Sequence, residues 1–313
     1  MESRPLGSSG VSVTEIGLGG WEFEGEEQRS PAAVRAIVEA SLESGSNWLD
    51  TAEVYHENRN ELVIGKALDG LRDELVLSSK VAPRPDGSGF RPEEVSSAAR
   101  ASLQRLGTDR IDVYFLHWPD DTGVPLLETW GAMASLVDDG LVRAIGLSNY
   151  STEEIESAHA QRPVDVIQQG LSMIDHLEER PVIARCGELG IGAVIYEPLA
   201  SGVLSGAVRT GEDIKEKFGD DIEEWPFFQR LFAPGRTEKT MALVDGVRAM
   251  AERLSATMPQ VAIAWVLAQR GVTSAICGTL NADHVRDNSG AAEIQLSEED
   301  LAELDALVAS ASS

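Results

Sequence analysis

The sequence predicts an α/β fold of the (β/α)8 barrel type, formed by residues 1–313 as one domain. Eight short apolar runs rich in Val, Ile and Leu alternate with segments whose apolar residues recur three or four positions apart. Most of these runs are apolar on both faces, which is typical of parallel strands that are buried on two sides. Eight strands alternating with helices over this length fit a closed barrel better than an open sheet.

The eight expected strands follow one another along the chain with helical segments between them. They are residues 13–20, 46–50, 74–80, 111–118, 142–149, 164–170, 192–198 and 272–278. The first helical segment starts at Pro31 and ends at Gly45, residue types that are favoured at a helix start and just beyond a helix end. Further helical segments cover residues 60–71, 92–107, 125–140 and 180–190.

A dinucleotide-binding open sheet is the main alternative architecture. It requires the spacing G-x-G-x-x-G between its first strand and an immediately following helix. The stretch "GLGGWEFEG" has neither that spacing nor a helix directly after it. The barrel is therefore preferred.

Two segments fall outside the repeating pattern. Residues 1–12 contain a glycine-rich turn between short apolar stretches, so we expect a β-hairpin that closes the floor of the barrel. Residues 205–236 form a long connection after the seventh strand, and connections of this length are usually functional lids or disordered. We favour a lid because the connection carries aromatic residues suited to packing: Trp225, Phe227, Phe228 and Phe232.

The composition bounds the partners and the compartment. The formal net charge of −26 disfavours nucleic acid and anionic membranes, whose binding requires Lys and Arg. No apolar stretch approaches the roughly 20 residues of a membrane span, and the first residues lack the apolar segment of a signal peptide. Cys186 and Cys277 lie in apolar contexts, which favours buried free thiols in the cytoplasm; a single disulfide between them is the alternative.

Polar residues stand at the ends of several expected strands, where barrel enzymes place their chemistry. Asp50 ends the second strand, Lys80 the third and His117 the fourth, and Tyr55 lies in the loop after the second. Each has a simpler explanation, since Asp50 could cap the helix that starts near Asn58 and the other three could be packing residues. Four such residues on one rim nevertheless make coincidence the weaker hypothesis. Further polar residues end the later strands: Ser148, Asn149, Gln168 and Tyr196.

The expected chemistry of this rim is proton transfer. An ammonium beside a phenol lowers its pKa, and a carboxylate touching the lysine holds that lysine charged and oriented. Tyr55 is then a usable general acid or base, and His117 can donate a hydrogen bond to a substrate oxygen. This arrangement suits a carbonyl that gains a proton while a hydride reaches its carbon, and the hydride must come from a cofactor.

These residues lie in motifs that resemble the aldo-keto reductase superfamily over nearly the whole chain. "NWLDTAEVY" resembles its D-T-A-x-x-Y signature, "LSSK" its lysine strand and "FLHWP" its histidine strand. "AIGLSNY" resembles its G-x-S-N-F/Y motif, and "YEPLASGVLSG" its Y-x-P-L-x-x-G-x-L-x-G motif. "AIAWVLAQRGVTSAICG" resembles its approach to the last strand, and the order of all these motifs matches.

The resemblance implies roles for individual residues. It implies a catalytic tetrad of Asp50, Tyr55, Lys80 and His117, with Tyr55 as the acid in reduction and the base in oxidation. It implies a nicotinamide cofactor, NADP or NAD, and a substrate pocket walled by Trp21, His56 and Trp118. The cofactor residues that it implies are Ser148, Asn149, Gln168, Tyr196, Leu199, Ser201, Gly202, Leu204, Gly278, Thr279, Leu280, His284, Asp287 and Asn288.

Departures from the family pattern bear on specificity. His56 stands where the family often has Gly and Asn60 where Ser is usual, so His56 either reaches the pocket or faces solvent. Leu280 stands where NADPH-preferring members often have Arg or a small polar residue, and Leu280 cannot pair with a 2′-phosphate. The helical register turns Arg286 away from that phosphate. We therefore expect tolerance of NADH or a preference for it.

Three functional classes remain in order of preference. The first is an NAD(P)-dependent oxidoreductase for uncharged aldehydes, ketones or sugars, because the loops that set the pocket are aromatic with few basic residues. The second is a nucleotide-binding regulatory subunit, and the third is a Schiff-base lyase that uses Lys80. We expect no metal, because the five histidines lack ligand spacing. The substrate itself, the direction of reaction and the oligomeric state are not indicated.

Overall fold

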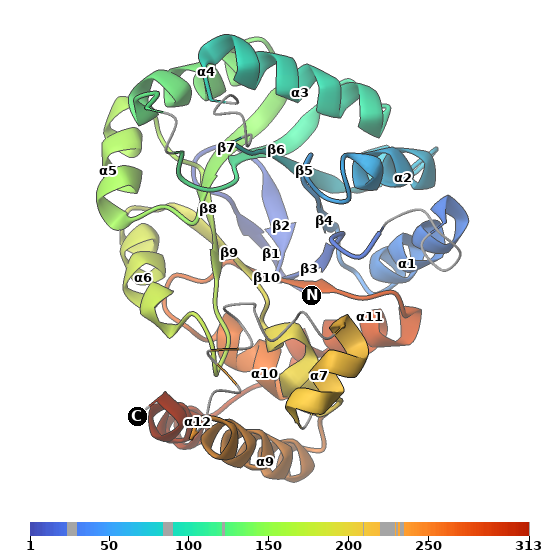
Figure 1. The fold of residues 1–313 in the computed structure, drawn as a ribbon, viewed down its shortest axis with the longest axis vertical. Coiled ribbons are helices and arrows are strands. Elements are labelled where there is room, and N and C mark those ends of the chain that lie inside the picture. The colour runs from blue at the N-terminus through green and yellow to red at the C-terminus, as the bar shows by residue number, and fades with distance from the viewer. Residues whose placement is uncertain are drawn as a thin grey trace.

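A computed structural model describes residues 1–23, 30–83, 90–120, 123–208, 210–219, 229, 231 and 235–312. Eight parallel strands close into a barrel in the ring order β10-β3-β4-β5-β6-β7-β8-β9. The helices lie on the outside of this ring (Figure 1). The predicted (β/α)8 barrel is confirmed.

The barrel strands coincide closely with the apolar runs of the sequence. They are β3 (Ile16–Gly19), β4 (Trp48–Asp50), β5 (Val76–Val81), β6 (Ile111–Leu116), β7 (Val142–Ser148), β8 (Val166–Gly170), β9 (Gly192–Tyr196) and β10 (Ser274–Gly278).

The expected strand over residues 13–20 was wrong in one respect, because it divides into two strands. Residues Ser12–Thr14 form β2, which pairs with β1 (Ser3–Pro5) in an antiparallel hairpin, and the barrel strand begins at Ile16. Glu15 marks the division, where its carboxylate forms an ion pair with Arg4 and accepts a hydrogen bond from the backbone nitrogen of Glu2. The predicted N-terminal hairpin is confirmed and extends two residues beyond its expected end.

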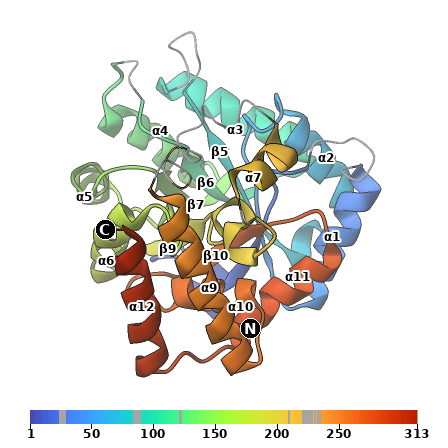
Figure 2. The ribbon, with the colours of Figure 1, turned by 60° about the horizontal axis from the view of Figure 1, so that its bottom comes forward.

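The helices follow the strands around the barrel. They are α1 (Pro31–Glu43), α2 (Arg59–Ala67), α3 (Pro92–Leu106), α4 (Leu126–Asp138), α5 (Thr152–Gln161), α6 (Arg180–Glu188), α7 (Gly211–Phe218), α9 (Thr237–Leu254), α10 (Met258–Leu267), α11 (Ala282–Ser289) and α12 (Glu298–Ser312), with short 3-10 helices η2 (Arg72–Glu74), η3 (Leu177–Glu179), η4 (Ala200–Ser205) and η6 (Gly290–Glu293). Both views place α9 and α12 side by side on one flank of the molecule (Figures 1 and 2).

Side chains alternate between the inside and the outside of the barrel because successive strand residues point to opposite faces. Near the amino ends of the strands the inward residues are apolar and pack with Leu6, Val11 and Val13 of the hairpin region, so the hairpin closes the barrel floor. Two to four residues further along, the same inward positions are polar. The inward positions of β4 show the change, with Trp48 at the floor and Asp50 at the mouth.

The remaining expectations are resolved only in part. Cys186 and Cys277 are free and buried, so the expected thiols are confirmed, and burial raises the pKa of each to about 12. Of the expected lid, α7 is described, whereas Trp225, Phe227, Phe228 and Phe232 lie outside the described residues. No helix in the described part of the chain has the length and apolar character needed to cross a membrane.

Candidate active site

The structure brings the predicted acid, lysine and tyrosine together at the barrel mouth. Lys80 is fully buried, and its ammonium nitrogen lies 2.6 Å from Oδ2 of Asp50 and 2.8 Å from the backbone oxygen of Thr51. The same nitrogen lies 3.3 Å from the phenol oxygen of Tyr55. Asp50 therefore does not cap the helix that follows, and its carboxylate belongs to this buried cluster.

The strand register explains why these groups meet. Asp50 of β4 pairs with Ser78 of β5, and Lys80 lies two residues further along on the same inward face. Ser78 donates a hydrogen bond to Oδ1 of Asp50, and the side chain of Gln168 donates a second one at 3.0 Å from across the barrel. A buried carboxylate requires such partners, because removing a charge from water is costly unless it is paired and hydrogen-bonded.

Tyr55 is held by aromatic neighbours in the turn after β4. Its ring lies 4.8 Å from that of Trp21 and 5.8 Å from that of His117, both in edge-to-face orientations. The next three residues, His56 to Asn58, all have left-handed backbone, with φ of 49°, 54° and 70°. Left-handed backbone is rare outside glycine and is typically retained at functional sites, so this turn marks the loop as one that positions a side chain.

The protonation states of the cluster follow from burial and charge. Burial raises the pKa of Tyr55 above its usual value, and although Lys80 lowers this pKa as expected, its effect is smaller than that of burial. Burial disfavours the charged form of Lys80, but Asp50 and Tyr55 outweigh it and raise the lysine pKa. Burial, and then Lys80, hold the pKa of His117 well below its usual value. At neutral pH the site therefore presents a protonated phenol, an ammonium and a neutral imidazole.

A second buried cluster lies behind the first, and the sequence analysis did not identify it. Glu61 of α2 is fully buried and accepts hydrogen bonds from Ser79 at 2.5 Å and from Arg105 of α3 at 2.6 Å. Arg105 also lies 3.8 Å from the carboxylate of Glu53, which accepts a hydrogen bond from the backbone of Ala82. Ser79 and Ala82 lie on either side of Lys80 in the sequence, so the Glu61–Arg105–Glu53 cluster holds the chain on both sides of this lysine.

Asn60 explains one departure from the family pattern. Its side chain is fully buried and contacts the hydroxyl of Thr51. Its amide donates to the backbone oxygens of Gly20 and Phe23, at 2.5 and 2.8 Å. Asn60 thus connects the start of α2 with the loop that contains Trp21.

Of the predicted substrate residues, Trp21 packs against the ring of Tyr55, Trp118 against His117, and His56 against Trp21. The side chains of Trp21 and Trp118 are 57% and 38% exposed, which is unusual for tryptophan and leaves both available to a ligand. The ring of Trp118 lies 4.3 Å from that of His117. Nε2 of His56 lies 2.6 Å from the backbone oxygen of Trp21, so the imidazole contacts the loop that contains Trp21.

The predicted cofactor residues at the ends of β7, β8 and β9 also meet. Asn149 has left-handed backbone with φ of 65°, and its amide nitrogen donates to the backbone oxygen of His117 and to Ser148, both at 3.0 Å. The hydroxyl of Tyr196 donates to Oδ1 of Asn149 at 2.8 Å. Gln168 reaches the acid cluster through Asp50. Amide and hydroxyl groups beside an aromatic ring suit the carboxamide and the flat ring of a nicotinamide.

The segment after β9 contributes backbone more than side chains. In η4, Ser201 and Gly202 have left-handed φ of 51° and 94°, whereas the side chain of Leu204 is fully buried. Leu199 packs partly against the core. A turn of this kind lets backbone groups approach a phosphate closely.

The residues around α11 are less closely connected to the site. Thr279 lies 3.3 Å from the ring of His284. Asp287 accepts hydrogen bonds from Thr257 and Gln260 of α10, so its carboxylate supports helix packing. Arg286 forms ion pairs with Asp283 and Glu43. The other predicted residues of this segment differ in exposure: Gly278 is exposed, Leu280 is half-buried and Asn288 is buried.

The fold and the site together define a barrel with a buried acid–base group at the carboxyl ends of its strands. The profile of the Aldo/keto reductase family matches residues 15–309. The chain is 34% identical over 311 residues to the probable aldo-keto reductase 1 of Glycine max, covering 96% of this chain and 86% of that protein. A crystal structure of the thermostable aldo-keto reductase Tm1743 with the inhibitor epalrestat is similar at a TM-score of 0.78 and 28% identity, covering 98% of this chain and 100% of that one.

The chain therefore belongs to the aldo/keto reductase family. Members of this family are oxidoreductases that act on small carbonyl compounds.

Proposed function

We propose that this protein is an NAD(P)-dependent oxidoreductase that interconverts an uncharged aldehyde or ketone and the corresponding alcohol. The observation that carries the proposal is the chain of contacts from Asp50 through the Lys80 ammonium to the phenol of Tyr55, at 2.6 and 3.3 Å. Such a chain suits a phenol that exchanges a proton with a bound ligand.

Each residue of the site has a separate role in carbonyl reduction. A bound nicotinamide supplies the hydride, and Ser148, Asn149 and Gln168 would hold its carboxamide while Tyr196 stacks on its ring. Tyr55, protonated at neutral pH, gives its proton to the substrate oxygen as that oxygen gains charge. Lys80 stabilises the phenolate that remains, because its ammonium lies beside the phenol oxygen. His117, neutral and mostly buried, orients the carbonyl by a hydrogen bond.

The surroundings favour an uncharged substrate. The described aromatic residues at the mouth, Trp21 and Trp118, present apolar surface, and the Lys80 ammonium in the described part of the site is already paired with Asp50. A phosphorylated substrate would need a free cation. For the cofactor, Leu280 favours tolerance of NADH, because an apolar side chain offers nothing to a 2′-phosphate.

The competing functions predict different behaviour from the same residues. A Schiff-base lyase needs a neutral, nucleophilic lysine, and the raised pKa of Lys80, caused by Asp50 and Tyr55 against the effect of burial, opposes that state. A regulatory nucleotide-binding subunit would bind the cofactor without steady turnover.

The deciding experiment screens aldehydes, ketones and polyols for turnover, followed by the absorbance of the reduced nicotinamide. We expect turnover with the parent protein and a loss of about 10²–10⁴-fold in kcat for Tyr55→Phe, since that variant lacks the hydroxyl that transfers the proton. Cofactor affinity should be unchanged in the variant. Equal rates for the two proteins would overturn the proposed role of Tyr55, and cofactor binding without turnover of any substrate would favour the regulatory function.

A further inference from the structure

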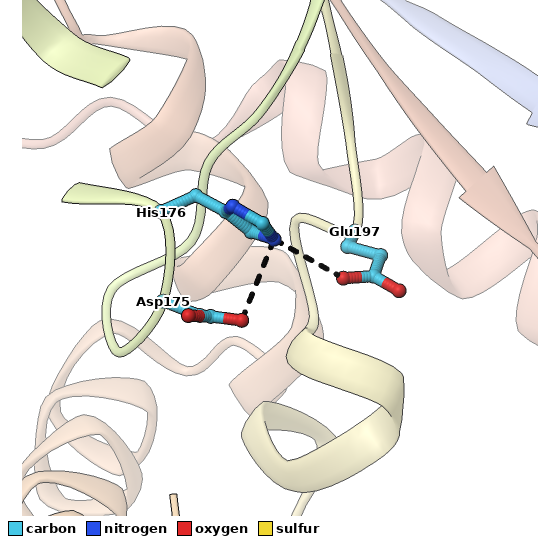
Figure 3. A group of neighbouring side chains, drawn as sticks. All are labelled: Asp175, His176 and Glu197. Carbon is cyan, nitrogen blue, oxygen red and sulfur yellow. Dashed lines mark ion pairs between the residues drawn. The ribbon is translucent and has the colours of Figure 1, made fainter. Parts of the chain in front are cut away.

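Three potential metal ligands meet beside the predicted cofactor site, and none of them takes part in the acid–base group. Asp175 and His176 lie in the connection between β8 and η3, and Glu197 directly follows β9. Nε2 of His176 lies 3.4 Å from Oδ2 of Asp175 and 3.7 Å from Oε2 of Glu197, and all three ligand atoms lie within 4.8 Å of one another. Figure 3 shows both carboxylates facing the same edge of the imidazole ring. We call these three residues the His176 cluster.

The spacing of the ligand atoms matches a metal site better than a hydrogen-bonded ion pair. A charge-assisted hydrogen bond between nitrogen and oxygen is about 2.7–2.9 Å long. A tetrahedral site with metal–ligand bonds of about 2.0–2.2 Å separates its ligand atoms by about 3.3–3.6 Å. The two nitrogen–oxygen distances, 3.4 and 3.7 Å, fall in or just beyond the second range. A cation between the imidazole and either carboxylate would therefore require only small movements, and the two carboxylate oxygens already lie within 4.8 Å of each other.

The fold holds the imidazole and one carboxylate in place through unusual local structure. His176 and Glu197 both have left-handed backbone, with φ of 57° and 55°, which turns their side chains toward each other. Gly170 at the end of β8 provides the space for the ring, since a Cβ at this position would lie 2.7 Å from Cδ2 of His176. The ring of Tyr196 lies 5.8 Å from the imidazole, in an edge-to-face orientation.

Charge and exposure also suit a cation. Two carboxylates face one imidazole in a chain whose formal net charge is −26, so a bound cation relieves the repulsion between them. The Asp175 side chain is only 4% exposed, whereas the side chains of His176 and Glu197 are 21% and 43% exposed. The cluster is thus open to solvent on one side, which gives a cation an entry path and leaves a position for water.

We propose that Asp175, His176 and Glu197 bind one divalent transition cation of the zinc class. One imidazole nitrogen with two carboxylate oxygens is a ligand set for Zn²⁺ or a similar metal, and Mg²⁺ binds such a set more weakly because it prefers oxygen and octahedral geometry. The ligands come from two connections of the barrel, and for this reason the spacing of histidines along the sequence did not indicate a site. The site stands apart from the proposed reaction.

The test is direct titration of the cofactor-free, tag-free protein with Zn²⁺ by calorimetry, repeated with Mg²⁺. We expect one saturable Zn²⁺ site per chain and much weaker binding of Mg²⁺. Co²⁺ should give a visible absorption band characteristic of nitrogen and oxygen ligation. His176→Gln should abolish both signals, and Asp175→Asn and Glu197→Gln should each weaken Zn²⁺ binding. Gly170→Ala, which displaces the ring without removing a ligand, should weaken it by about 10–100-fold.

The matched control is Glu178→Gln, which removes the same charge from an exposed residue of the same segment but lies outside the cluster. We expect its Zn²⁺ affinity to equal that of the parent. Melting curves without metal establish that each variant is folded, and the partly exposed Glu197 supplies a variant with little effect on the fold. The proposal is overturned if the parent and His176→Gln bind Zn²⁺ equally, or if Glu178→Gln weakens binding as much as Glu197→Gln does. Because turnover is not measured, failure here leaves the proposed reaction untouched.

Discussion

The two sides of the barrel mouth are built in different ways. On the acid–base side, at β4 and β5, Lys80 and Asp50 are buried and joined by a short ion pair. On the side proposed to bind the cofactor, after β7 and β9, Asn149 and Glu197 are exposed and have left-handed backbone. Folding thus completes the first side by itself, whereas the second side exposes polar groups and strained turns that a ligand can contact. Proton transfer requires the first kind of order, and the exchange of a cofactor requires the second.

The largest expected effect is the loss of the charge that completes the acid–base side. Lys80→Met leaves the Asp50 carboxylate buried without its cation, and breaking a buried pair in this way costs about 3–5 kcal/mol of unfolding free energy. Chemical denaturation measures this cost. The control is Lys66→Met on α2, an exposed lysine, which should change stability little. Turnover should also fall sharply with Lys80→Met.

The pH dependence of stability checks the same pair independently. The folded-state pKa of Lys80 is raised: burial opposes the charge, but Asp50 and Tyr55 outweigh it. A raised pKa contributes stability that is fully present below the unfolded value of about 10.4 and is lost as pH rises through the folded value. The double variant Asp50→Asn/Lys80→Met should lack this alkaline loss and regain part of the stability of the single variant. If Lys80→Met were as stable as the parent, the predicted contribution of the buried Asp50–Lys80 pair to stability would be wrong.

The Glu61–Arg105–Glu53 cluster extends the acid–base side and should give the next largest effect. Arg105→Leu leaves two carboxylates, which are at most 4% exposed, without the guanidinium that they share. We expect a loss of about 3 kcal/mol in unfolding free energy, near the lower end for a broken buried pair. The turnover that remains should show lower kcat with little change in the KM for cofactor, because the cluster positions Tyr55 and Lys80 only.

The matched control for Arg105 is Arg100→Leu on the same helix, where the side chain is 55% exposed and pairs at 3.6 Å with an exposed Asp139. Its effect on both stability and kcat should be small. Equal effects of the two variants would show that the buried cluster has no special role.

The sequence indicated the parts of this molecule that depend on local pattern. Strands buried on both faces are apolar throughout, so the polar residues that end them, such as Asp50 and Lys80, stood out. The contact between Glu61 and Arg105 joins residues 44 positions apart, and no periodicity marks such a pair. The left-handed backbone of His56 was equally hidden, because a non-glycine residue adopts it only under tertiary constraint. The net direction of the Tyr55 pKa depends on burial, which only the folded structure supplies.

On the cofactor side, Leu280→Arg tests the proposed cofactor preference. A guanidinium here could form a charge-assisted hydrogen bond with a 2′-phosphate, a contact of about 1.5–3 kcal/mol. We expect the ratio of kcat/KM for NADPH over NADH to rise by about tenfold or more. Steady-state assays with both cofactors measure this ratio, and Leu280→Met controls for the change in packing. A parent enzyme that already prefers NADPH strongly would contradict the proposed NADH tolerance.

The smallest expected effect concerns the left-handed turn in η4, after β9. Ser201 in η4 and Ser255 at the end of α9 have nearly the same left-handed φ, 51° and 54°, but only Ser201 lies in the predicted cofactor site. Replacing either with glycine removes a backbone cost of about 1–2 kcal/mol and adds flexibility to the unfolded chain, so the net gain should stay below about 1 kcal/mol. Melting curves should show similar small rises for both variants, whereas cofactor titration should show weaker binding for Ser201→Gly alone, since its hydroxyl is lost at the expected pyrophosphate position. If Ser255→Gly weakened cofactor binding equally, the left-handed turn after β9 would have no particular connection with binding. The two sides of the mouth would then differ only in how deeply their side chains are buried.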